Sequence, residues 1–359
     1  MSAVARRVLV VMGLACGVLV AAATPAAAHG IGGTEPTNYE TTLTRVDPEV
    51  RGLHVEVIDL GERLQLTNDT ARDVVVLGYE DEPYLRVGPR GVFENRRSPA
   101  TYLNRSRVPE VRAPAIADSH APPEWQRVGD GPTVSWHDHR AHYMGTQDPG
   151  PVRVDPDRRH VLDRWTVELR HGDRSVLVHG VLAWEPPPSP WPSVAVAVVG
   201  AALVVGVSRT RWWRGTLVVA LTALVVCACL HAVGHWAASS EDLATKAGES
   251  IYSIAGIVLG VVALAWAWRR GVEAAVPFVL VAAVFLLVAG GLADIATLGH
   301  SQVPSTLDPV VARLAVALTI GLGVGLAIAA ALRLRVVGPP RPPADDGARL
   351  SPVRTPVTS

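Results

Sequence analysis

The densest group of candidate metal ligands in the chain is the segment 135–144, which reads SWHDHRAHYM. His137, His139 and His142 fall within six residues, and Met144 follows them. Imidazole is a common ligand for copper, zinc, nickel and iron, and three histidines around an open position describe many such sites. On a strand, His137 and His139 would share one face, and a turn after them would bring His142 alongside. The segment predicts a metal site, with an exposed polar strand or hydrogen-bonded histidines as the alternative.

His29 is a second candidate ligand, because processing would make it the first residue of the mature chain. Arg6 and Arg7 precede the apolar run 8–23, and three alanines at 26–28 form a typical cleavage site. We therefore expect residues 1–28 to be a signal peptide. A terminal histidine offers its α-amino and ring nitrogens to one ion, a chelate suited to Cu(II). The alternative is that cleavage leaves a histidine there by chance.

A weaker cluster lies in the apolar carboxy-terminal part. His231 and His235 are four residues apart on one predicted helix, Asp294 lies near the end of another, and His300 follows it. Ionisable groups inside membrane spans are costly and usually mark function. We expect all four near the outer surface. Two roles are consistent with this placement: relay of a metal ion and ligation of a haem. The alternative for His235 and His300 is a place in the wet interface.

The elements that must position these residues belong to two classes. Between the predicted signal peptide and about residue 185 the chain has stretches that alternate apolar and polar residues, as at 53–57, 64–66 and 165–169, with a hairpin completed by 176–184. Such short strands separated by Gly, Pro, Asn and Asp turns predict an extracytoplasmic antiparallel β-sandwich (Ig/cupredoxin-like) of about seven strands over 29–185. Residues 105–131 are expected to form a long loop.

A bundle of about five transmembrane helices is expected to follow a Pro-rich stalk at 186–193. The transmembrane domain spans 194–335 and a disordered cytoplasmic tail spans 336–359, with apolar segments at about 194–208, 216–235, 251–268, 274–297 and 309–332. Arginine clusters follow the first, third and fifth segments, whereas the other loops are acidic or neutral. The positive-inside rule then puts the β-domain outside the cell membrane of a multi-pass protein.

Several function classes lack support. The net charge is zero, so nothing indicates a nucleic-acid partner, and no nucleotide-binding loop or nucleophile motif is present. The predicted exported part has no cysteine, which argues against a blue-copper centre and against a thiolate Cu(I) site. The expected partners are the lipid bilayer and a metal donor or acceptor protein, and an enzymatic role is not indicated.

The segments 78–104 (GYEDEPYLRVGPRGVFENRRSPATYLN) and 135–144 resemble a family of uncharacterised actinobacterial membrane proteins, which implies no catalytic residue. The layout is also similar to fusions of the periplasmic copper-resistance proteins CopC and CopD, in which a small β-sandwich begins with a histidine and precedes a helical membrane domain. That likeness covers architecture, His29 and the element His137-Asp138-His139. The present chain departs from it in having a larger exported domain and fewer spans.

Together these patterns favour a membrane-anchored extracytoplasmic metal-binding protein, with copper as the leading metal and zinc as the other option. A non-metal envelope protein with a protein-interaction β-domain is the rival hypothesis. A membrane haem or redox protein is a weaker third.

Overall fold

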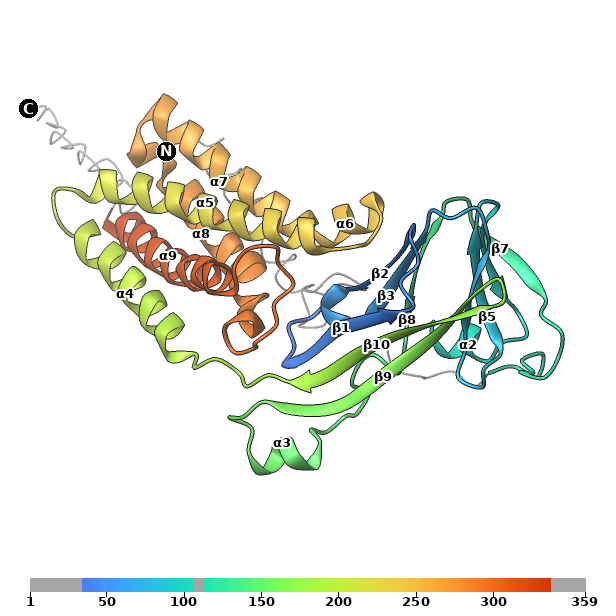
Figure 1. Cartoon of the computed structure of the whole chain (residues 1–359). Helices are drawn as coiled ribbons and strands as arrows, with labels where there is room; N and C mark the ends of the chain where they lie inside the picture. The colour runs from blue at the N-terminus through green and yellow to red at the C-terminus, as the bar shows by residue number, and fades with distance from the viewer. Residues whose placement is uncertain (1–33, 106–112, 337–359) are drawn as a thin grey trace, which may run out of the picture.

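The computed structural model describes residues 34–105 and 113–336, so the predicted signal peptide, His29 and nearly all of the tail lie outside the described residues. It contains a β-domain followed by a bundle of helices (Figure 1). The predicted fold class is confirmed. The described part has ten strands rather than about seven, and every strand pairing is antiparallel.

The strands form two sheets. The larger sheet has the order β1-β10-β9-β4-β5-β6-β7, in which the strands are β1 (Tyr39–Asp47), β10 (Arg174–Trp184), β9 (His160–His171), β4 (Val74–Leu77), β5 (Pro83–Gly88), β6 (Gly91–Asn95) and β7 (Trp125–Gly129). The smaller sheet has the order β2 (Leu53–Ile58), β3 (Arg63–Asn68) and β8 (Thr133–His137). Short helices α2 (Ala100–Leu103) and α3 (Gly150–Val154) lie in the connections.

The alternating residues of the predicted strands fill one core. Leu64 and Leu66 of β3 and Val167 and Leu169 of β9 are all fully buried in a cluster that also includes Trp136 of β8. Burying one face of each sheet against the other is what stabilises a sandwich. The predicted hairpin is β9 and β10, whose residues pair from His171 and Arg174 outward.

Two local predictions need correction. Part of the segment 105–131, expected to be loop, forms β7, because Trp125 to Gly129 pair with β6 and make the edge strand of the larger sheet. The strand β8 ends at His137, so His139 does not share a strand face with it. The chain turns immediately after β8, where the Ala141 amide bonds to the Asp138 carbonyl.

Five helices of the described part are long and apolar enough to cross a membrane. They are α4 (Trp191–Ser208), α5 (Trp213–Ala238), α7 (Ile251–Arg270), α8 (Val272–Leu286) with its π-helical continuation η2 (Leu287–Leu292), and α9 (Pro309–Val336). The short α6 (Leu243–Glu249) and η3 (Ile295–Leu298) lie between them. The first apolar helix therefore begins at Trp191, inside the segment expected to be a stalk.

The β-domain is docked against one end of the helical bundle, as Figure 1 shows. The loop after α5 donates from the Ser240 hydroxyl to the Asp59 carboxylate in η1 (Asp59–Gly61), at 2.6 Å, and Glu241 of the same loop forms an ion pair with Arg63. A second loop, 299–308, which we call the docking loop, exchanges two backbone hydrogen bonds between Gln302 and Thr37. The two domains are thus held at two separate points.

Candidate functional site

The turn after β8 brings the three histidines of the motif together. The ring centroids of His139 and His142 are 5.5 Å apart, and those of His137 and His142 are 6.5 Å apart. His142 is buried, whereas His137 and His139 are half-buried. The clustering that the spacing predicted is present, but it is produced by the turn and not by a shared strand face.

Backbone carbonyls orient two of these rings. The Nδ1 of His137 lies 3.1 Å from the Glu62 carbonyl oxygen, and the Nδ1 of His142 lies 3.1 Å from the Asp138 carbonyl oxygen. A carbonyl only accepts, so each Nδ1 must carry the hydrogen, and the neutral ring then holds its lone pair on Nε2. Histidines that bind metals are commonly oriented by such a bond from the other nitrogen.

A buried ion pair, which the sequence analysis did not identify, builds the turn itself. The Asp138 side chain is fully buried and accepts from Arg140 Nη2 at 2.8 Å and from the indole nitrogen of Trp136 at 3.0 Å. The Tyr79 hydroxyl accepts from the His139 amide, and its ring lies under the Arg140 guanidinium. The acid and the arginine two residues apart in the motif were the only sequence signal for this network, which gives Trp136, Asp138 and Arg140 a structural role.

Electrostatics keep His137 neutral. Burial lowers the pKa of its imidazole below the usual 6.5, and the positive charge of Arg63 lowers it further. Arg63 is the residue opposite His137 in the β3–β8 pairing. A neutral imidazole is the form that binds a metal, so this part of the cluster is ready for coordination at neutral pH.

The cluster is not a preformed metal centre. Within residues 34–105 and 113–336, no group of three or more His, Cys, Asp or Glu side chains is arranged to hold a metal ion. Two of the three ring pairs, at 5.5 and 6.5 Å, nevertheless have the centroid separation of about 5 to 6.5 Å that two imidazoles bonded at about 2 Å to the same ion would have. Met144, two residues beyond His142, has 37% of its surface exposed.

The membrane cluster is only partly assembled. The Nε2 of His231 lies 2.9 Å from Asp294 Oδ2, so these two residues meet as expected. His235 instead directs its Nδ1 at the Pro304 carbonyl, 3.2 Å away, and His300 directs its Nδ1 at the Ala296 carbonyl, 2.7 Å away. These two histidines hold loops in place in the structure.

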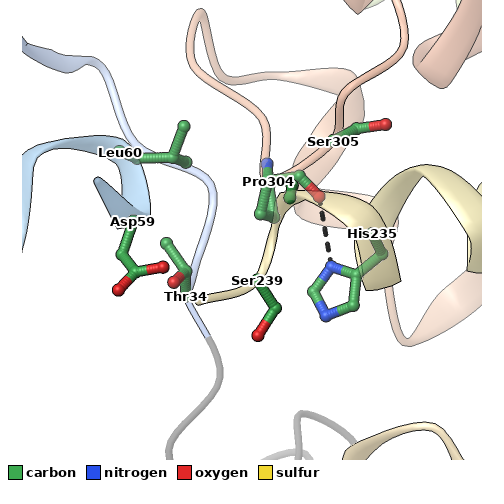
Figure 2. A pocket seen from close by; sticks show the side chains of 8 residues that line it. Thr34, Asp59, Leu60, His235, Ser239, Pro304 and Ser305 are labelled. Carbon is green, nitrogen blue, oxygen red and sulfur yellow. Dashed lines mark hydrogen bonds between the residues drawn. The ribbon is translucent and has the colours of Figure 1, made fainter. Parts of the chain in front are cut away.

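A small pocket lies where the β-domain meets the bundle, and His235 is on its wall. Figure 2 shows the His235 ring beside Ser239, with Asp59 and Thr34 of the β-domain across the pocket. The Asp59 carboxylate is already occupied, since it accepts from Ser240 and faces Arg63 Nε at 3.5 Å. The pocket therefore offers one imidazole and several hydroxyl groups, which is a weak donor set for a metal.

No protein-family model, curated protein or solved structure matches the chain.

Proposed function

We propose that this chain is a membrane-anchored extracytoplasmic metal-binding protein whose site is built from His137, His139 and His142. The observation that carries the proposal is the grouping of the three rings at centroid distances of 5.5 and 6.5 Å, with two of them oriented through Nδ1. Orientation of a neutral imidazole by a carbonyl is a frequent arrangement around bound metals. The membrane helices would anchor this site at the bilayer surface.

The site would assemble around the ion. His139 is on the turn and is half-buried; its backbone amide donates to the Tyr79 hydroxyl, and its ring stacks on the Tyr79 ring with a centroid distance of 6.1 Å. Rotation of the His139 side chain would let its ring join those of His137 and His142. His29 stays a predicted fourth ligand, since it lies outside the described residues.

Copper is the metal that the donor set suits best. The ligands are imidazoles without a thiolate, because the two cysteines in the described part, Cys227 and Cys229, are both in α5. Nitrogen ligands bind Cu(II) more tightly than Zn(II), as the usual affinity order of divalent metals predicts. We therefore expect Cu(II) to bind first and Zn(II) to compete weakly.

Arginine placement supports an extracytoplasmic position for the site. The β-domain contacts the bundle end that carries the α5–α6 loop and the docking loop. At the other end Arg333 donates to the Ser208 carbonyl, and Arg214 pairs with Glu273. Because arginines favour the cytoplasmic side, we infer that the β-domain faces outward.

The test is a calorimetric titration of the purified full-length chain in detergent with Cu(II) and then with Zn(II). The parent should bind about one ion, and the triple variant His137→Gln/His139→Gln/His142→Gln should lose that binding. The matched control replaces His54 and His120, which are exposed elsewhere in the β-domain. Equal affinity in the triple variant would remove these residues from the site.

A non-metal envelope role is the second candidate, and one specific observation favours it. Asp138, Arg140 and Trp136 of the motif form a saturated structural network, so the motif has a packing role that needs no metal. Absence of binding in both the parent and the variant would favour this role. The contact of His231 Nε2 with Asp294 does not favour haem ligation by His231.

A further inference from the structure

The pairing of His231 with Asp294 has no part in the metal site of the β-domain. His231 lies seven residues before the end of α5 at Ala238, or about 10 Å inside the helix end. Its side chain is 13% exposed and that of Asp294 is 25% exposed. An ionisable pair at this depth is costly to place among apolar helices and is a functional candidate for that reason.

Asp294 does not perform the ordinary structural task of a loop aspartate. It precedes the helix η3, yet its side chain makes no capping hydrogen bond there. By contrast, Asp242 accepts from the Ala244 amide and Asp308 accepts from the Val310 amide, and so each caps a helix. The carboxylate of Asp294 is directed at His231 instead of at its own helix.

The backbone before Asp294 departs from a regular helix. Residues 287–292 form the π-helix η2, although the sequence predicted a continuous span over 274–297. An extra residue in one turn rotates everything after it by about 100°, and such π segments are frequent at functional sites. The glycine at position 291 lets η2 lie close to α9, because an added Cβ would lie 2.9 Å from Ile320 Cγ1.

The free nitrogen of the pair indicates which ligand fits. The Nδ1 of His231 is buried and has no hydrogen-bond partner among the described residues. An unsatisfied buried polar atom costs about 1–3 kcal/mol, so the pair is not optimised for stability alone. A buried atom has no room for a metal ion with its other ligands, whereas a proton needs no added space.

We propose that His231 and Asp294 form a proton-binding pair in the outer part of the membrane domain, linked to the docking of the β-domain. The link is short in sequence. Asp294 immediately precedes η3, and the docking loop follows η3. In that loop the Ser301 amide donates to the Asn38 side chain at 2.8 Å, and Gln302 forms the bridge with Thr37. A proton taken up by this pair would therefore act at the base of the docking loop.

Other ionisable groups toward this end of the bundle have different partners. His235 and His300 bond to backbone carbonyls, and Arg313 of α9 donates to the carbonyls of His300 and Ser301. Asp308 caps α9, and Tyr252 lies in the first turn of α7. Asp294 is the one charged partner that acts on His231 among the described residues.

The first test is an NMR titration of the full-length chain in nanodiscs with isotope-labelled histidine, between about pH 4.5 and 9. The His231 signal is identified by its loss in His231→Gln. It should titrate in this range, and Asp294→Asn should move its midpoint by at least about one pH unit. The control Asp308→Asn should leave it unchanged, and Asp294→Glu, which keeps the carboxylate, should retain the coupled titration. A His231 signal that does not titrate, or that ignores Asp294→Asn, would overturn the pair.

The second test measures hydrogen exchange of the docking loop at one fixed pH. Asparagine mimics the protonated, uncharged carboxyl group, so Asp294→Asn should change exchange in 299–308 and in the facing segment 34–40. Asp308→Asn should not change exchange in 34–40. Unchanged exchange in both segments of the Asp294→Asn variant would overturn the link to docking. Both tests are independent of metal binding.

Discussion

Arg63 lies opposite His137 in the antiparallel pairing of β3 and β8, and it also reaches out of the β-domain to Glu241 in the loop after α5. One guanidinium thus lies between a candidate ligand and the membrane domain. Its charge disfavours protonation of His137, and the carboxylate of Glu241 offsets part of that charge. The protonation of the histidine cluster and the docking of the two domains are therefore electrostatically connected.

Replacing Arg63 by Gln should raise the pKa of His137, because the nearby positive charge that opposes protonation is removed. The rise should be modest, since Arg63 is partly exposed and solvent screens its charge. Histidine NMR of the full-length chain measures it. Arg72→Gln, on the β3–β4 connection, is the control and should have no effect on His137. A fall in the His137 pKa would contradict this account.

The thermal stability of the β-domain should fall as the pH falls below about 6.5, and His137 should account for part of the loss. Its pKa is lowered in the folded state, so the unfolded chain binds the proton more readily. Stability from this residue is complete above the unfolded pKa and is lost between that value and the lower folded one. In His137→Gln the slope of the melting temperature against pH should be shallower over this interval. An unchanged slope would show that His137 does not contribute.

Asp138→Asn should destabilise the β-domain by about 3 kcal/mol, because it leaves the charge of Arg140 without its buried partner. Asp130→Asn provides the matched control, since Asp130 pairs with Arg127 at the surface and such pairs contribute about 0–1 kcal/mol. The melting temperatures of the two variants in detergent make the comparison. Similar small losses in both would show that the Asp138 network is dispensable.

Gly321→Leu should disrupt the packing of α9 against α4. A Cβ at this position would lie within 2.4 Å of the Ala197 carbonyl oxygen, whereas Gly206 on α4 has nothing within 4 Å. We expect the first variant to lower the melting temperature of the membrane domain by several degrees and Gly206→Leu to change it little. Equal effects would mean that close helix approach is not what position 321 requires.

If cleavage after Ala28 occurs and His29 is a ligand, one residue added before it should weaken Cu(II) binding. The addition removes the α-amino donor while preserving every side chain. That amine has a usual pKa of about 7.7–8.0, so its contribution should also grow as the pH rises from about 6 to 8. Calorimetry on the processed chain and on the extended chain compares the two. Equal affinities would exclude His29 and leave the cluster at 137–142 to be judged separately.

The sequence by itself determined the division of the chain into a β-domain and five apolar helices. Strand alternation at Leu64 and Leu66 and the long apolar runs report burial directly, because burial of apolar surface is a local consequence of residue type and spacing. The density of His137, His139 and His142 likewise identified the place to look. Prediction from the sequence reached its limit in the number of strands, which is ten instead of about seven. It also missed β7 in an expected loop, since the pairing of an edge strand depends on a distant partner.

Only the tertiary structure decided which of these residues meet and how each is held. His231 and Asp294 are 63 residues apart in the chain, and the π-helical turn that precedes Asp294 was not predicted from the sequence. His235 and His300 are each held by a backbone carbonyl, and these positions depend on the docking loop and its neighbours. Hydrogen bonds are short-ranged and directional, so a residue's partner follows from the packing of distant elements and cannot be read from its spacing along the chain.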